Sequence, residues 1–239
     1  MDRQLEPELL DELPATDPRA IKSRRDLQRV NAWMGNTLIM AHALRSAFQS
    51  RPPRCLVELG AGDGTFLLHV AQRLAPDWPG TTAVLLDRQD IVSQKTRHGF
   101  GELGWPAEII VADVFDWLRD HGTQKWDAVI ANLFLHHFSE SQLSVLLSQA
   151  SQQTRVFIAI DPRRSTWSLL ACRLLWFIGC NAVTRHDAIA SVRAGFAARD
   201  LTALWPAGAD WLLQERPANF SSHLFTAERG FAPVSPSAS

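Results

Sequence analysis

Leu56-Val57-Glu58-Leu59-Gly60-Ala61-Gly62-Asp63-Gly64-Thr65 is the stretch of sequence that decides the fold. Its apolar residues predict a buried strand with an acid near its end, and its alternate glycines predict a tight turn into a helix over residues 66–74. A carboxylate at a strand end can accept hydrogen bonds from a ligand's ammonium group. Glycines lack the Cβ atoms that would keep a ligand away from the backbone. We therefore predict a ligand site formed by Glu58, Gly60, Ala61, Gly62 and Gly64.

The spacing of the glycines separates two classes of nucleotide-binding site. A dinucleotide-binding fold has the pattern G-x-G-x-x-G, whose third glycine would stand where this chain has Thr65. The pattern G-x-G-x-G behind a strand-terminal Glu58 resembles instead the first motif of the class I S-adenosylmethionine (AdoMet) methyltransferases. That resemblance implies S-adenosyl-L-methionine as the cofactor. A nicotinamide oxidoreductase is the less favoured alternative.

Four more apolar segments follow in the order that such a fold requires, at residues 82–87, 107–112, 126–132 and 155–160. Asp87 ends the first of them, where an acidic side chain of a Rossmann-like sheet binds the ribose hydroxyls of a nucleotide. Asp113 follows the second and can hold an adenine amino group beside an apolar wall. The predicted cofactor-binding residues of these segments are Asp87, Arg88, Asp113, Val114, Phe115 and Asn132.

The order of the elements predicts an α/β fold. Strands alternate with helices from Arg54 onward, which implies right-handed crossovers and a mainly parallel sheet. Residues 210–215 and 222–228 predict two strands whose short connection makes them antiparallel. A terminal antiparallel hairpin on a parallel sheet resembles the class I methyltransferase architecture, which implies seven strands with helices on both faces.

The chain divides into a cap, a core and a tail. Asp17-Pro18 predicts the start of a helix that runs to Gly35-Asn36, and a second helix follows as far as Arg51. Residues 1–15 are acidic, and we expect their ends to be loose. The predicted parts are an N-terminal helical cap over 1–53, an AdoMet-binding core over 54–232 with an apolar insertion at about 163–185, and a disordered tail over 233–239.

Composition favours one soluble enzyme domain in the cytoplasm. The chain has 239 residues and a formal net charge of −1, so no long-range field attracts nucleic acid or an anionic membrane. The three cysteines, Cys55, Cys172 and Cys180, lie in apolar segments and are expected to be reduced. Residues 1–20 carry no apolar run, so we expect no signal peptide. The chain has no tyrosine, which excludes a phenol as catalytic base.

The chemistry is predicted in the loop after the fourth strand, at residues 132–140. This segment resembles the motif of small-molecule O-methyltransferases in which His-Asp-Trp-Ser-Asp supplies the base. The resemblance implies that His136 is the base that takes a proton from an acceptor hydroxyl, with His137 as a further catalytic residue. His137 stands where the family has an acid, so another carboxylate, or none, orients the base.

Two alternatives to a hydroxyl acceptor stand beside this prediction. The triplet His136-His137-Phe138 also resembles benzoquinol-type C-methylases, which leaves a quinol-like ring carbon as acceptor. A non-catalytic AdoMet-binding partner protein would keep Glu58 and Asp87 but need no base. We expect no metal site, because adjacent histidines rarely converge on one ion and no acid is spaced along the sequence to join them.

Residues 168–183 form one of the most apolar stretches of the chain. They are too short to span a membrane, so we expect no integral membrane segment. Three interpretations of this stretch are open. It forms a core helix that buries Leu170, Leu174 and Phe177, it forms a lid over the acceptor, or its outer face lies on a membrane surface. Asp187 is expected to cap the next helix. The expected partner is a small aromatic or hydrophobic acceptor and no nucleic acid; the oligomeric state stays open.

Overall fold

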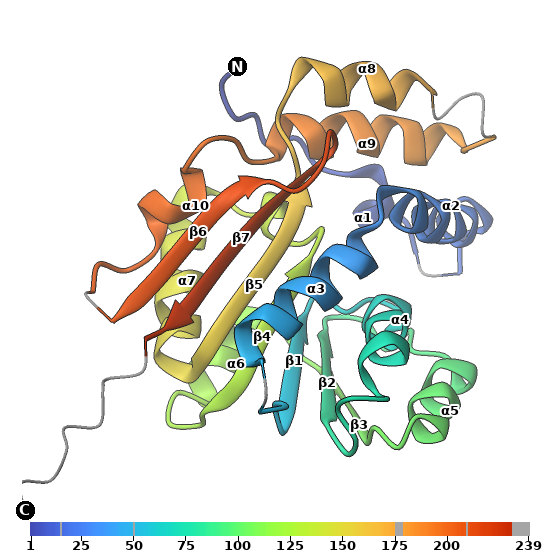
Figure 1. Ribbon diagram of the computed structural model, residues 1–239. Helices are drawn as coiled ribbons and strands as arrows, with labels where there is room; N and C mark the ends of the chain where they lie inside the picture. The colour runs from blue at the N-terminus through green and yellow to red at the C-terminus, as the bar shows by residue number, and fades with distance from the viewer. Residues whose placement is uncertain (15, 50, 175–178, 209, 231–239) are drawn as a thin grey trace, which may run out of the picture.

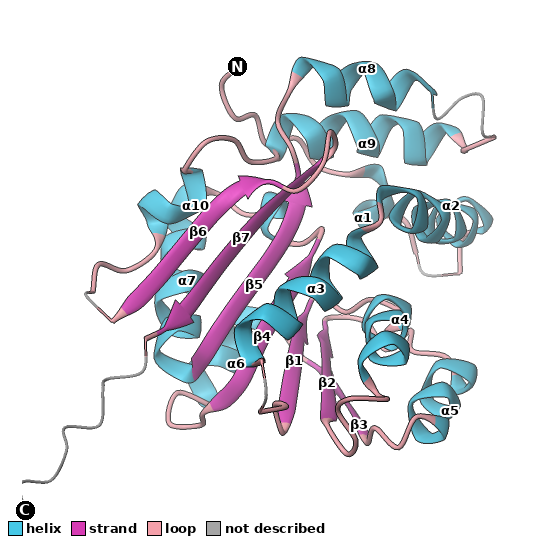
Figure 2. Ribbon diagram, viewed as in Figure 1, coloured by secondary structure: helices cyan, strands magenta, loops and turns pink. Residues whose placement is uncertain are grey.

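The computed structural model describes residues 1–14, 16–49, 51–174, 179–208 and 210–230. A seven-stranded sheet runs through the centre of the molecule in the order β3-β2-β1-β4-β5-β7-β6 (Figure 2). The first five strands pair in parallel, and β7 pairs antiparallel with both β5 and β6. The strands are β1 Cys55–Leu59, β2 Thr82–Asp87, β3 Ala107–Val111, β4 Trp126–Asn132, β5 Thr154–Pro162, β6 Trp211–Pro217 and β7 Ser222–Arg229.

Helices cover both faces of this sheet (Figure 1). They are α1 Leu9–Glu12, α2 Pro18–Met34, α3 Asn36–Phe48, α4 Thr65–Leu74, α5 Gln94–Glu102, α6 Val114–Asp120, α7 Glu140–Gln153, α8 Thr166–Leu174, α9 Ala182–Ala194 and α10 Asp200–Leu204, with a 3₁₀ turn η1 at Leu135–His137. The mainly parallel sheet, the antiparallel terminal hairpin and the two helical layers confirm the predicted class I methyltransferase fold.

Alternate residues of the strands supply two separate cores. Leu56, Leu85 and Ile130 pack with α3, α4 and α5 on one face of the sheet. Val57 and Val129 pack with α6, α7 and α10 on the other face. Successive side chains of a strand point to opposite faces, so continuous apolar runs are what a sheet covered on both sides requires. This burial fixes the sheet and therefore the loops at its carboxyl edge.

Helices α2, α8 and α9 gather beyond the carboxyl edge of the sheet, and α8 and α9 lie beside the N-terminus (Figure 1). A buried polar network joins α2 to α9. Asn181 N–H donates to Asp26 Oδ2 at 2.9 Å, and the Thr184 hydroxyl donates to Ser23 Oγ at 3.0 Å. Within the described residues no helix is long and apolar enough to cross a membrane.

Two local predictions in this region are wrong. Asn181, and not Asp187, caps α9, because its side chain accepts from Thr184 N–H at 2.8 Å. Asp187 lies inside the helix and caps α1 instead, accepting from Leu9 and Leu10 N–H at 2.9 and 3.0 Å. Leu170 is 47% exposed and not part of the core. Phe177, the side chain of Leu174 and the predicted tail over 233–239 lie outside what is described.

Candidate active site

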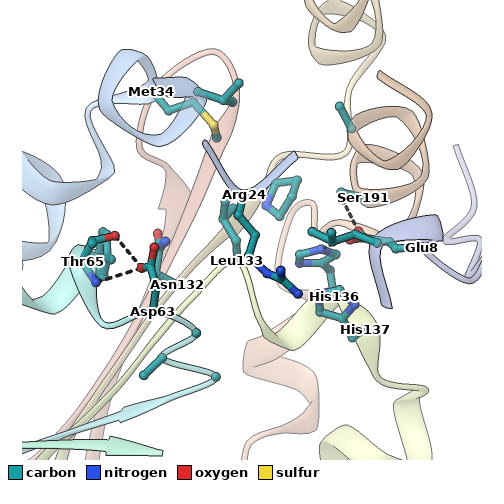
Figure 3. A pocket seen from close by; sticks show the side chains of 18 of the residues that line it. Glu8, Arg24, Met34, Asp63, Thr65, Asn132, Leu133, His136, His137 and Ser191 are labelled. Atoms are coloured by element: carbon teal, nitrogen blue, oxygen red, sulfur yellow. Dashed lines mark hydrogen bonds and ion pairs between the residues drawn. The ribbon is translucent and has the colours of Figure 1, made fainter. Parts of the chain in front are cut away.

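The carboxyl ends of β1, β2 and β4 border two adjoining cavities of about 320 and 590 Å³. Ligands of open α/β sheets bind at this edge, where the strand order reverses. Figure 3 shows the smaller cavity, with Asp63 and Thr65 of the glycine loop on one side and Glu8, His136 and His137 on the other. The two cavities share the lining residues Glu8, Gly60, Asp87, Gln89, Leu133, His136 and His137.

Glu58 is the buried acid of β1, with 1% of its surface exposed. The side chain lines the smaller cavity, yet its Oε2 atom has no hydrogen-bond partner among the described residues. Burial, helped by the nearby carboxylates of Asp63 and Asp87, raises the pKa of Glu58 well above its usual value. A cation entering the cavity would offset the cost of ionising this acid.

The three glycines of the loop between β1 and α4 have different surroundings, and each is required for a different reason. Gly62 has φ +56°, and no atom lies within 4 Å of the place that a Cβ would take. Its N–H donates to Asp87 Oδ2 at 2.8 Å, which ties the loop to β2. At Gly60 a Cβ would stand 2.1 Å from the Phe134 ring, so this glycine admits an aromatic side chain of the protein itself. Gly64, whose Cβ would meet Leu85, lies outside the lining of both cavities.

The other predicted cofactor residues are distributed over the two cavities. Ala61 and Asn132 line the smaller one, and Asn132 Oδ1 accepts from Asn36 Nδ2 at 3.0 Å. Arg88 lines the larger one. Asp87 lines both, and its Oδ1 atom accepts from Gln89 N–H at 2.9 Å.

The predicted adenine pocket belongs to the larger cavity. Asp113 and Val114 line it, and Asp113 also caps α6 by accepting from Phe115 N–H at 2.9 Å. The Phe115 ring lies outside the lining and packs edge-on against Phe138, with 5.4 Å between the ring centroids. Phe138 does line the cavity. The apolar wall beside Asp113 therefore consists of Val114 and Phe138, with Phe115 behind.

This set of residues fits AdoMet. The unpartnered Oε2 of Glu58 suits the ammonium group of the methionyl part, since a buried polar atom without a partner costs free energy until a donor reaches it. Gly62 leaves its surroundings open for close approach of a ligand. Asp87 lies where the two cavities meet and could accept from ribose hydroxyls. The assignment of each residue to a part of the cofactor stays a prediction.

His136 lies on η1 and is held between two carboxylates. Its ring is buried, and Nδ1 lies 2.8 Å from Asp161 Oδ1 at the end of β5. The same oxygen accepts from the backbone N–H of His136 at 3.2 Å. The other ring nitrogen, Nε2, lies 3.3 Å from Glu8 Oε1, and Glu8 also accepts from the Ser191 hydroxyl. The imidazole is therefore fixed in one orientation with Nε2 toward the cavities.

The two carboxylates set the protonation of this histidine. Burial alone would lower the pKa of His136, but the hydrogen bonds and charges of Asp161 and Glu8 outweigh it and raise the pKa to about 9. Burial would raise the pKa of Glu8, but contact with His136 lowers it to about 2. At neutral pH the ring is an imidazolium that donates from both nitrogens. With Asp161 and Glu8 both in contact with the ring, His136, the predicted base, is held in its protonated form.

Two partners of His136 escaped the sequence prediction. Asp161 supplies the orienting carboxylate that the sequence left open; its position at the end of the fifth predicted strand was the available signal. Glu8 lies in the middle of the acidic N-terminal segment, for which the sequence predicted loose ends but not a contact with the site. Hydrogen bonds of Glu8, Leu9 and Leu10 tie the middle of this segment to η1 and α9. No local pattern links Glu8 to a residue so distant in sequence.

His137 is exposed and lines both cavities, with its ring centroid 4.3 Å from that of His136. Glu8, His136 and His137 each offer one atom that could bind a metal ion, and these three atoms lie within 4.8 Å of one another. The expectation that no acid could join the histidines was therefore wrong, since the fold brings one from the N-terminus. We assign no ion to this group, because the Nε2 atom of the imidazolium is occupied by its proton and by Glu8.

Comparison with known proteins connects the chain to methyltransferases. No protein-family model matches it. Over 160 residues the chain is 27% identical to an uncharacterised methyltransferase of Mycobacterium bovis, a match that covers 64% of this chain and 72% of the relative. A protein of the same description from Mycobacterium tuberculosis matches to the same extent.

Solved structures resemble this chain over a larger part of its length than the sequence relatives do. An O-methyltransferase family protein from Burkholderia thailandensis matches with a TM-score of 0.60 and 18% identity, over 90% of this chain and 61% of that one. The pyocyanin biosynthetic protein PhzM matches with a TM-score of 0.55 and 16% identity, over 90% and 60%. The chain thus spans about three fifths of these structures, and at such identities the likeness concerns the fold.

Proposed function

We propose, from the premise that this chain is a class I methyltransferase by its fold and its sequence relatives, that it methylates a small aromatic or hydrophobic acceptor at a hydroxyl oxygen. The methyl donor is S-adenosylmethionine. One observation carries the proposal: the unpartnered carboxylate oxygen of Glu58 and the Asp161-held imidazole of His136 face the same cavity. The first suits the donor's ammonium group, and the second suits a reacting hydroxyl.

The donor supplies an electrophilic methyl group, and the protein mainly has to align it with the acceptor. Glu58 and Gly62 would bind the methionyl part, and Asp87 the ribose. Asp113 and Val114 would hold the adenine in the larger cavity. Alignment of this kind converts a bimolecular displacement into an effectively unimolecular one.

His136 would remove the proton of the acceptor hydroxyl. Nε2 accepts that proton as the oxygen attacks, and Asp161 holds Nδ1–H and stabilises the imidazolium that forms. The step requires an unprotonated Nε2. With a pKa of about 9 for His136, the reaction is expected to speed up as the pH rises toward 9.

The walls of the smaller cavity support an apolar acceptor. Nonpolar side chains from α2, α8, α9 and the turn after β4 surround the space beyond His136, which favours a flat or hydrophobic molecule with few polar groups. They are Val30, Met34, Leu133, Ala171, Cys172 and Val192. In this proposal α8 covers the acceptor, since Ala171 and Cys172 face inward while Trp167 is 74% exposed.

Replacement of each histidine tests the base role. His136→Asn should lower turnover by about two to four orders of magnitude and leave AdoMet affinity nearly unchanged, because general base catalysis contributes on that scale. His137→Asn is the matched control, with the same change one residue along the loop and a smaller expected loss. Normal turnover of His136→Asn would rule out the base role.

Product analysis separates the remaining candidates. Methylation of a ring carbon is the second candidate, favoured by the His136-His137-Phe138 triplet that resembles benzoquinol-type C-methylases. A new carbon–methyl bond, seen by NMR of the product, would establish it. Binding of AdoMet without any methylated product across phenols and quinols would favour the non-catalytic partner protein.

A further inference from the structure

The first ten residues form an N-terminal strap that lies along α9 and η1. The Arg3 guanidinium donates to the carbonyl oxygens of Ala194 at 2.7 Å and Phe138 at 2.8 Å, and it lies 4.8 Å from the centroid of the Phe196 ring. Gln4 N–H donates to the Arg193 carbonyl at 3.1 Å. Figure 1 shows this end of the chain beside α8 and α9. The hydrogen bonds that hold the strap are contacts that water could replace if the strap were displaced.

Glu8 is the residue of the strap that enters the site. Its side chain is 12% exposed, lines both cavities, and lies 3.3 Å from Nε2 of His136. That nitrogen is the atom from which the proposed base would act. In Figure 3, Glu8 and Ser191 lie beside His136 on the side away from the glycine loop. An acceptor oxygen hydrogen-bonded to Nε2 would need the place that the Glu8 carboxylate now fills.

The charged groups around His136 come from several elements. Asp161 of β5 holds Nδ1, and Glu8 of the strap holds Nε2. Arg3 donates to the His136 carbonyl oxygen at 3.2 Å, and His137 stacks beside the ring. Arg24 of α2 lines the smaller cavity with His136, while α9 contributes the neutral Ser191. Asp161 belongs to β5 of the sheet, whereas Glu8 belongs to the strap, which hydrogen bonds hold to α9 and η1.

We propose that Glu8 is a positioning residue for the base: it keeps Nε2 of His136 in the N–H form, and an acceptor hydroxyl reaches an unprotonated Nε2 only after displacing Glu8. This inference rests on the proposed function. Once Glu8 has left, the imidazolium gives its proton to water and becomes the neutral base. The acceptor O–H proton then passes to Nε2 as the oxygen–methyl bond forms and the sulfur–methyl bond breaks. Return of the strap restores the ion pair.

Titration of His136 by NMR in ¹⁵N-histidine-labelled protein tests this directly. Glu8→Gln keeps the size of the side chain and removes its charge, so the pKa of His136 should fall from about 9 toward lower values. Glu6→Gln is the control on the same strap, where Glu6 pairs with Arg193 at the surface, and it should titrate as wild type does. The spectrum of His136→Asn identifies the resonance.

A second variant guards against misfolding of the first. Asp187→Asn keeps the Glu8 side chain but weakens the two hydrogen bonds that hold α1 beside α9. The strap that carries Glu8 should loosen, so the pKa of His136 should fall in this variant too. An unchanged titration in whichever of the two variants is folded would overturn the inference.

The pH dependence of kcat/KM links the titration to the reaction. In wild type the acidic limb should lie near pH 9, and in Glu8→Gln it should move to lower pH. Each unit of that shift raises the unprotonated fraction at pH 7 about tenfold. A shifted titration with full turnover by His136→Asn would refute the base role alone. An unshifted titration with an inactive His136→Asn would refute the Glu8 inference alone.

Discussion

At the scale of a single residue, we predict that Glu58 couples donor binding to the release of a proton. In the free protein, burial raises the pKa of this acid, whereas an ammonium group beside Oε2 would favour its ionised form. AdoMet binding should therefore release a proton, and affinity should increase with pH until the free acid is itself ionised. Calorimetry in two buffers of different ionisation enthalpy measures that proton.

Glu58→Gln gives the matching variant test. The amide cannot balance the ammonium charge, so AdoMet affinity should fall by about 10–100-fold, the scale of a hydrogen bond to a charged group. Glu102→Gln, a change at an exposed position of α5, should bind as wild type does. Buffer-independent heats in wild type, with unaltered affinity in Glu58→Gln, would show that this acid does not meet the donor.

Single residues were predictable where their role follows from position in a local motif. Glu58 and Asp87 end strands, and His136 follows a strand, so sequence order alone places them at one edge. Glu8 was not predictable, because its contact with His136 exists only after α9 has positioned the strap. The raised pKa of His136 was equally hidden, since it depends on two carboxylates from distant parts of the chain.

At the scale of the element, the glycine loop makes a specific prediction about packing. Gly60→Ala would place a Cβ 2.1 Å from the Phe134 ring, whereas Gly62→Ala would meet no atom within 4 Å. Both glycines have positive φ, so both variants carry backbone strain of about 1–2 kcal/mol. Urea denaturation should show a larger loss of stability for Gly60→Ala, since it adds overpacking.

Phe134→Ala provides the control for this prediction. In the double variant with Gly60→Ala, the missing ring should relieve the clash, so the two effects should not add. Equal losses in Gly60→Ala and Gly62→Ala, or additive losses in the double variant, would mean that Phe134 does not constrain the loop.

Element boundaries were predictable where the signals are local. Each later strand predicted from the sequence begins and ends within two residues of the observed one. A capping box of Ser139 and Gln142, a local sequence pattern, opens α7. The structure of the region after β5 was not predictable, because its apolar run fits a core helix and a lid equally well. Asp187 illustrates the reason: a carboxylate suited to capping one helix from outside caps another from within α9.

At the scale of the whole molecule, the cap and the α8–α9 region close the site with apolar side chains. Phenolic acceptors with alkyl chains of rising length should therefore bind progressively tighter, by up to about 0.8 kcal/mol per buried methylene. The gain should stop when the chain fills the apolar part of the smaller cavity, whose volume of about 320 Å³ also includes the proposed methionyl site. Ala171→Phe would fill part of that space and should end the gain earlier. Flat affinity across the series would assign the apolar walls a purely structural role.

The central claim is that the molecule binds AdoMet at the edge formed by β1 and β2, and calorimetry of AdoMet tests it most directly. Wild type should bind AdoMet and give no binding heat with NAD. Asp87→Ala should lose roughly 1–3 kcal/mol of affinity. Asp90→Ala, a change three residues along at the surface, should bind as wild type does. Wild type that ignores AdoMet, or Asp87→Ala that binds it as tightly as wild type, would contradict the account.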